Sequence, residues 1–314
     1  MLHVLINTIF PIFSIILLGY FLSLKQIINA DFARPANQIV FNVAIPAMLL
    51  NEISQAPFRE NFNSTAVLCC LAALGGLTLV AVVLAKILKI SEASRGTFVQ
   101  SSLHGNIGYM SYAIAYYTLG EAHFAKMAIL GSFVMLAQNL LGVWALTAFT
   151  PGASTSGRMR GTLKHIFRNP IIVTVALGIV YSALGFSIPG PIQRGLNILS
   201  GMAFPTALLL IGASLSFGAV RVMVREVVGI GLLKLLGLPF LGYVLMKLAG
   251  VPDALILVGM ILLASPPATV TYVMATEMGG NPELAATSVS IHTLLSAFSY
   301  SLIISSFANV HLSG

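Results

Sequence analysis

Two short stretches of the chain combine helix-breaking residues with a small polar side chain. The first contains Gly105, Asn106 and Gly108, and the second contains the pair Pro266 and Pro267. Glycine permits non-helical torsions, and a proline pair removes two backbone donors and disfavours helix before it. An interrupted helix exposes free N–H groups and the positive end of a helix dipole, which suit a carboxylate. The Asn106 amide adds a group that both donates and accepts hydrogen bonds.

Both stretches lie inside long apolar segments. Of the 314 residues, 57% are hydrophobic and 8% are charged, whereas a soluble domain carries about 25% charged residues. This composition excludes a water-soluble globular protein, a disordered chain and a secreted disulfide scaffold. The net charge of +7 does not indicate nucleic acid as a partner, because the basic residues lie between apolar segments, where they set membrane orientation.

A membrane-spanning helix needs about 20 mostly apolar residues. Ten such segments are predicted, at approximately 4–23, 36–54, 65–88, 97–118, 125–149, 168–187, 195–217, 226–248, 254–276 and 284–307. The two helix-breaking stretches fall within the fourth and ninth segments. We expect a first five-helix repeat at 1–150, a cytoplasmic linker at 151–167 and a second five-helix repeat at 168–314.

The two halves share residues at a fixed spacing. At an offset of 159, Pro11 matches Pro170 and Pro46 matches Pro205, and the two helix-breaking stretches match at an offset of 161. Because each half has an odd number of spans, the second half enters the membrane from the opposite side. Inverted repeats are typical of secondary transporters, in which the two copies exchange conformations and open the site to each side in turn.

The distribution of lysine and arginine favours one orientation. If the N-terminus lies outside, the inside loops hold 11 Lys and Arg residues and the outside loops hold 4. The positive-inside rule then places both termini on the outer, periplasmic side. The N-terminus lacks the positive region of a signal peptide, so the first apolar segment is interpreted as a spanning helix.

Motifs of several enzyme classes are missing from the sequence. It contains no H-E-x-x-H, no G-x-x-x-x-G-K-[ST] and no G-x-S-x-G, so we expect neither an enzyme nor an ATP-driven pump. Cys69 and Cys70 are adjacent in an apolar segment and are interpreted as packing residues. No metal site or cofactor is predicted, other than H⁺ or Na⁺ as a coupling ion.

Four ionisable residues in the spans require an explanation, because inserting an ionisable side chain at the centre of a spanning helix costs about 2.5–3.5 kcal/mol. Lys234 either offsets a bound anion, occupies a cation site or reaches back to the inner interface. Glu277 is either a solvated helix end or a coupling residue. His104 and His292 either couple proton movement to transport or pack as hydrogen-bonded core residues, and His104 ranks higher because it adjoins Asn106.

The matched prolines Pro46 and Pro205 are weaker candidates. They bend helices that line the substrate path, with Asn42 one turn before Pro46, or they form purely structural kinks. The sequence leaves both alternatives open.

Several motifs occur in a recognisable order along essentially the whole chain. They are FNVAIPA at 41–47, GNIGY at 105–109, RNP at 168–170, PTAL at 205–208, IGASL at 211–215, Lys234 five residues before Pro239, PP at 266–267 and YVMATE at 272–277. Together they resemble the auxin efflux carrier family, specifically its short bacterial members that act as malate or malonate permeases. A position in the bacterial cytoplasmic membrane follows from this resemblance.

The resemblance implies a ten-helix fold like that of sodium/proton antiporters and bile-acid symporters. Spans 1, 2, 6 and 7 would form a scaffold that mediates homodimerisation. Spans 3–5 and 8–10 would form a mobile transport unit in which the broken helices 4 and 9 cross. The substrate would lie between the two units, at the crossing.

The resemblance also implies which residues contact the substrate. It assigns this role to Asn106 and to a polar residue of the fifth helix, Gln138 or Asn139. Plant relatives carry an acidic residue in the third span, where this chain reads LCCL at 68–71, and this departure argues against auxin as substrate and against plant-like coupling. The full set of expected substrate contacts is Gly105, Asn106, Ile107, Pro266, Pro267, Ala268, Asn42, Gln138 and Asn139.

The sequence therefore predicts an all-α membrane protein that transports a small organic anion, a mono- or dicarboxylate. Transport would be secondary active transport or uniport, with an elevator-type movement that alternates access. The main alternative is a sodium-coupled solute symporter, and a second alternative from another class is a membrane sensor that does not transport.

Overall fold

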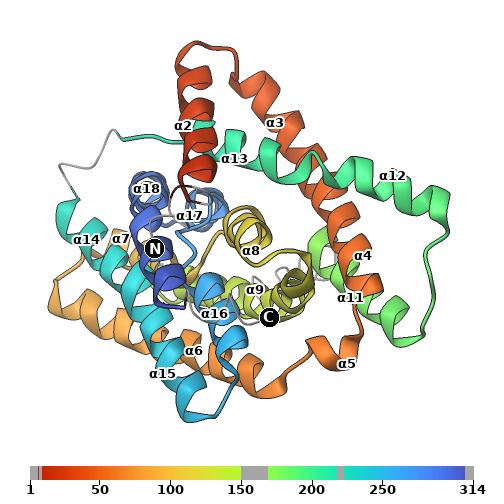
Figure 1. Ribbon diagram of the computed structural model, residues 1–314. Helices are drawn as coiled ribbons and strands as arrows, with labels where there is room; N and C mark the ends of the chain where they lie inside the picture. Colours follow the sequence, from red (N-terminus) through yellow and green to blue (C-terminus); the bar gives the residue numbers. More distant parts are fainter. Residues whose placement is uncertain (1–5, 7–8, 150–168, 218–222, 308–314) are drawn as a thin grey trace. The chain divides into compact units, whose positions relative to one another are not determined.

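The computed structural model describes residues 6, 9–149, 169–217 and 223–307. The linker expected at 151–167 lies outside these residues. Within the described part of the chain, all regular structure is helical apart from one isolated β-bridge, as Figure 1 shows. The prediction of an all-α protein is confirmed for this part of the chain.

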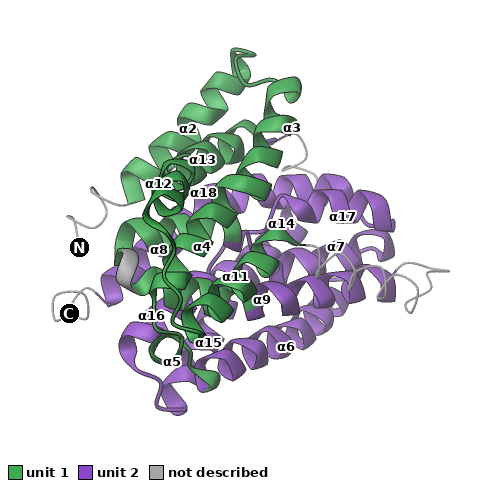
Figure 2. Ribbon diagram, turned by 90° about the vertical axis from the view of Figure 1, so that its right-hand side faces the viewer, with its two compact units in different colours: residues 1–64, 108–132, 167–214 green, residues 65–107, 133–166, 215–314 purple. Residues whose placement is uncertain are grey.

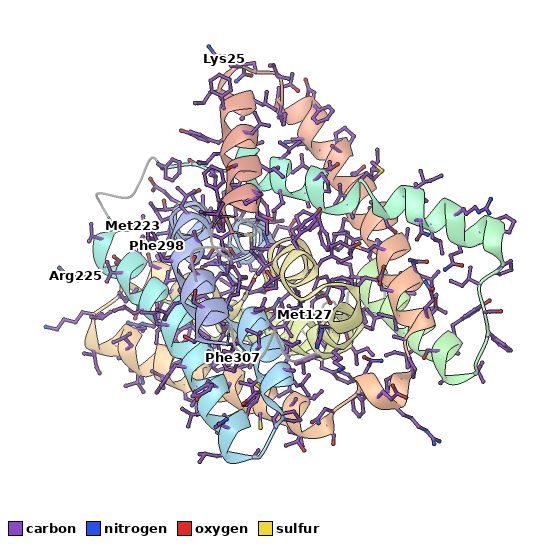
Figure 3. The ribbon with its side chains drawn as sticks, viewed as in Figure 1. Lys25, Met127, Met223, Arg225, Phe298 and Phe307 are labelled. Carbon is purple, nitrogen blue, oxygen red and sulfur yellow. The ribbon has the colours of Figure 1, made fainter. Side chains whose placement is uncertain are left out.

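Several helices have the length and composition of membrane spans. Five of those described qualify: Ser64–Ile87, His123–Ala148, Gly190–Ala213, Val224–Leu248 and Pro282–Ser306. Shorter apolar helices occur at Phe10–Leu24, Pro170–Ala183 and Asp253–Leu263. Large apolar side chains also point outward, such as Phe298, which is 76% exposed (Figure 3). The chain is therefore an integral membrane protein whose outer apolar surface suits lipid.

The chain forms two compact units, shown in green and purple in Figure 2. Unit 1 contains α2 (Phe10–Leu24), α3 (Ala30–Ile39), α4 (Ile45–Gln55), α5 (Phe58–Asn61), α8 (Tyr112–Leu119), α11 (Pro170–Ala183), α12 (Gly190–Ser200) and α13 (Ala203–Ala213). Unit 2 contains α6 (Ser64–Ile87), α7 (Glu92–Leu103), α14 (Val224–Gly231), α15 (Leu238–Leu248), α16 (Asp253–Leu263), α17 (Val270–Met278) and α18 (Pro282–Ser306). Helix α9 (Glu121–Ala148) begins in unit 1 and ends in unit 2. Each unit contains segments from both halves of the sequence.

In unit 1, α2 and α13 pack with their backbones in direct contact. A methyl group on Gly19 of α2 would overlap the carbonyl of Leu209, and one on Gly212 of α13 would overlap the carbonyl of Ile16. Only glycine permits this approach, because any Cβ would have to occupy the space of a neighbouring backbone atom.

The pair α11 and α4 repeats this arrangement less tightly. A Cβ on Gly178 of α11 would lie 3.0 Å from the Cβ of Ile53 on α4. Gly178 stands at the same offset from Gly19 that relates the matched prolines. The first helix of each half of the sequence thus packs on the second spanning segment of the other half, inside unit 1.

Two prolines are each preceded by a π-helical turn. The turn η2 (Val40–Ala44) ends two residues before Pro46, and η4 (Leu232–Gly237) ends two residues before Pro239. Proline lacks the N–H of a normal helical bond and its ring clashes with the carbonyl four residues earlier, so the preceding helix widens. Pro205 instead lies near the start of α13, just after the gap between α12 and α13.

We expect Gly212→Ala to lower the free energy of unfolding by about 1–3 kcal/mol, because the added methyl group forces α2 and α13 apart. The matched control is Gly195→Ala on α12, where no described atom lies within 4 Å of a Cβ. Thermal unfolding of the purified protein in detergent measures both. Equal melting temperatures for the two variants would contradict the close packing of α2 on α13.

Candidate functional site

The helix interruptions predicted around positions 106 and 267 are both present. Helix α7 ends at Leu103, and the π-helical turn η3 (Ile107–Ser111) follows after three residues and continues into α8. Helix α16 ends at Leu263, and α17 begins at Val270. The sequence Gly105-Asn106 and the pair Pro266-Pro267 lie in the two gaps, where helix-breaking residues are expected.

The two interruptions pair with each other inside unit 2. Gly105 and Pro267 form an antiparallel β-bridge. On its two sides the Asn106 N–H donates to the Pro266 carbonyl over 2.8 Å, and the Ala268 N–H donates to the His104 carbonyl over 3.0 Å. Backbone groups that have lost their helical partners are thereby satisfied by protein, as the interior of a bilayer demands.

The side-chain amide of Gln138, from α9, forms two hydrogen bonds with the backbone of Gly105. Its Oε1 accepts the Gly105 N–H over 2.9 Å, and its Nε2 donates to the Gly105 carbonyl over 2.9 Å. Gln138 is buried, so both bonds are shielded from solvent. The neighbouring Asn139 donates instead to the Met135 carbonyl of its own helix. Of the two fifth-helix candidates, Gln138 therefore reaches the first interruption, where it holds the backbone.

Lys234 lies at the C-terminal ends of α7 and α16. Its Nζ donates to the carbonyls of Leu103 and Leu263, each over 3.2 Å. These are the last residues of α7 and α16, where the negative ends of two helix dipoles converge. Lys234 is 1% exposed, so it does not reach back to the interface. Its amino group therefore lies at the centre of the paired interruptions.

The space beside Gly105 is filled by its neighbours. A Cβ on this residue would lie 2.8 Å from the Cβ of Ser265 and 2.9 Å from the Nζ of Lys234. Glycine is therefore required here by steric contact. Ser265 was not singled out in the sequence, although its place directly before the proline pair was a usable signal.

Asn106 offers an unused polar side chain at this site. Only 8% of the residue is exposed, and within the described residues its side-chain amide forms no hydrogen bond. The turn η3 begins at the next residue, Ile107, and α17 begins without a side-chain cap at its N-terminus. The site therefore combines an amide without a described partner and the uncapped N-terminus of α17, and helix N-termini are typical anion-binding features.

The remaining coupling candidates differ in their surroundings. His104 is buried, and its carbonyl takes part in the pairing of the interruptions. His292 on α18 is also buried, and its Nε2 donates to the Val227 carbonyl over 2.9 Å. Glu277 is exposed near the end of α17, and its role stays a prediction.

The candidates in the second and seventh spans belong to unit 1, not to the unit that contains the paired interruptions. Asn42 is exposed in η2 and donates to the carbonyl of Gln38 over 2.8 Å. Pro46 and Pro205 lie near the starts of α4 and α13. Their expected role along the substrate path stays a prediction.

Apolar spanning helices with paired interruptions are typical of membrane transporters, because unwound backbone is tolerated where it lines a site. A sequence model of the family described as membrane transport protein matches residues 4–159 and 155–304 of the chain. The chain belongs to this family, that of the auxin efflux carriers, as its motifs indicated.

Relatives of the chain carry transporter names. A protein of Rhizobium meliloti named "Putative malonate transporter" is 26% identical over 294 residues, which cover 92% of this chain and 91% of that protein. An uncharacterized transporter of Methanocaldococcus jannaschii is 27% identical over 225 residues, covering 68% and 70%. An uncharacterized transporter of Escherichia coli is 24% identical over 241 residues, covering 70% and 73%. These names support transport rather than enzymatic activity.

We expect Gln138→Leu to lower the free energy of unfolding by about 1–3 kcal/mol, because it leaves the N–H and carbonyl of Gly105 without their side-chain partner in an apolar interior. Asn139→Leu is the matched control, since Asn139 bonds only within its own helix among the described contacts. Thermal unfolding in detergent measures both variants. If Gln138→Leu is as stable as Asn139→Leu, the amide does not support the interruption.

We also expect Lys234→Met to destabilise the protein by about 1–3 kcal/mol, because a side chain of similar length leaves the carbonyls of Leu103 and Leu263 unpaired. Lys247→Met is the control. Lys247 is exposed and pairs with Asp253 at the surface, so its loss should leave the melting temperature close to that of the unmodified protein. A melting temperature of Lys234→Met that matches the control would contradict the assigned contacts.

Proposed function

We propose that the protein is a secondary transporter or uniporter of small organic anions, specifically mono- or dicarboxylates. The observation that carries the proposal is the placement of charge around the two interruptions. The two C-terminal helix ends share the amino group of Lys234, whereas the N-terminal ends that follow Asn106 and Ala268 have no such compensation among the described contacts.

The physical argument follows from the low dielectric of the membrane interior. Helix N-termini carry a partial positive charge and point their N–H groups outward, so they attract a negative ligand. The segment that carries an acidic residue in plant relatives carries Cys69 and Cys70 here, so an internal carboxylate at that place does not compete. A substrate carboxylate would supply the missing charge and accept a hydrogen bond from the Asn106 amide.

The comparisons support the same substrate class. One relative, which matches over 92% of this chain, is named for malonate, a small dicarboxylate. Malonate is therefore the first probe to use, followed by monocarboxylates and other dicarboxylates.

We further propose ten spans arranged as two inverted repeats with elevator-type transport. The reciprocal packing of α2 on α13 and of α11 on α4 supports the repeat, because it is the arrangement that exchange of equivalent helices produces. The β-bridge and the hydrogen bonds that pair the interruptions lie within unit 2, so in this proposal they would move as one body with that unit. In this proposal unit 1 supplies the scaffold of a homodimer, and both termini face the periplasm.

Uptake of labelled malonate into proteoliposomes tests the proposed function. We expect Asn106→Ala to raise the KM for malonate about tenfold or more, because a hydrogen bond to a charged group is lost. Its melting temperature should not fall, because the described contacts give the Asn106 side chain no internal partner. Asn197→Ala on the exposed face of α12 is the control. Unchanged uptake by Asn106→Ala would remove this residue from the site, and no movement of any carboxylate would refute the substrate class.

A further inference from the structure

Three oxygen atoms of unit 2 lie near the amino group of Lys234. Two are the carbonyl oxygens of Leu103 and Leu263, each 3.2 Å from Nζ. The third is Oγ of Ser265, which follows the end of α16. A Cβ on Gly105 would lie 2.9 Å from Nζ of Lys234 and 3.0 Å from Oγ of Ser265, so the amine and the hydroxyl border the same space.

The hydroxyl of Ser265 has no hydrogen-bond partner among the described residues, although the residue is 0% exposed. Buried polar side-chain atoms almost always have a partner, so this oxygen requires an explanation. A protonated lysine has three N–H donors, and the described contacts of Lys234 use two of them. The lysine and the serine therefore belong to one set of contacts around a shared space.

The chemistry of the three oxygens is that of a cation site. Transporters with interrupted helices coordinate Na⁺ through unwound carbonyls and the C-terminal ends of half-helices. The carbonyls of Leu103 and Leu263 are such ends, and their partial negative charge attracts a cation. None of the three oxygens belongs to a carboxylate, whereas sites for Ca²⁺ and Mg²⁺ use carboxylates. The set therefore suits a monovalent cation.

The Lys234 amino group is held at this place by the chain itself. Lys234 lies in η4, inside the apolar segment Val224–Leu248, and is 1% exposed. A free ion exchanges with the solution, whereas a side chain stays attached to its helix. The amino group can therefore bond to the ends of α7 and α16 whatever salt surrounds the protein.

We propose that the oxygens of Leu103, Leu263 and Ser265 form a site for a monovalent cation, and that the Lys234 amino group fills this site in place of Na⁺. Shortening Lys234 opens the site to free Na⁺. Anion transport by the unmodified chain requires no Na⁺ at this site, and this part of the inference rests on the proposed function. The cation site itself can be measured without a substrate.

Thermal unfolding of the purified protein in detergent tests the site. The unmodified protein and Lys234→Ala are compared in equal concentrations of NaCl and choline chloride, which keep ionic strength and chloride the same. We expect the unmodified protein to melt at the same temperature in both salts. Lys234→Ala should melt about 2–4 °C higher in NaCl, because an ion that binds only the folded state stabilises it by mass action.

Three further variants test which atoms hold the ion. Ser265→Ala, added to Lys234→Ala, removes one oxygen and should abolish most of the response to Na⁺. Lys234→Met fills the same space with an apolar chain of similar length, so its melting temperature should be the same in both salts. Lys247→Ala removes an exposed lysine paired with Asp253 and should also show no response.

Folding of the shortened variant is part of the test. If Lys234→Ala does not fold, Lys234→Ser leaves the same space and is measured in its place. Failure of both variants to fold in NaCl would overturn the inference, since Na⁺ should replace the missing amino group. The inference is also overturned if folded Lys234→Ala melts equally in both salts, or if Na⁺ stabilises the unmodified protein as much as the variant.

Malonate uptake into proteoliposomes separates this inference from the proposed function. We expect the unmodified protein to transport malonate at the same rate in NaCl and in choline chloride. Uptake that requires Na⁺ would overturn the inference and leave the anion carrier in place. If no carboxylate moves in either salt, while Lys234→Ala still responds to Na⁺, the proposed function fails and the cation site stands.

Discussion

The structure depends on one constraint, which is that backbone groups released from a helix inside the apolar interior must find partners in the protein. The two interruptions meet this constraint by pairing with each other through Gly105 and Pro267. The Gln138 amide completes the hydrogen bonds of Gly105, and Lys234 donates hydrogen bonds to the last carbonyls of α7 and α16. Each of these partners is needed at its position, because the loss of any one of them would leave a buried polar group without a hydrogen bond.

The same arrangement makes the site electrically asymmetric. Lys234 serves the negative helix ends, whereas the positive ends follow Asn106 and Ala268 without an internal counter-charge among the described contacts. Because Asn106 is neutral and the helix N-termini carry a partial positive charge, the proposed site would attract an anion rather than a cation. In the proposed function, the architecture of the interruptions, which stabilises the fold, would also select the class of ligand.

The sequence predicted the features that leave a local signal. The composition indicated spanning helices, and the Gly-Asn and Pro-Pro stretches indicated both interruptions, because torsion and missing donors act on the residue that carries them. The sequence did not predict that Gln138 pairs with Gly105 or that His104, Gln100 and Met274 lie beside Gly142. Those contacts join a side chain to backbone or to a distant helix, and such pairings leave no periodic pattern in one sequence.

The central claim is that a carboxylate binds at the paired interruptions, and a structure of the protein with malonate bound tests it most directly. The account predicts density for a carboxylate group within hydrogen-bond distance of the Asn106 amide and the N-terminus of α17, with Lys234 still bonded to the ends of α7 and α16. Continuous helices through positions 106 and 267, or malonate bound away from them, would contradict it.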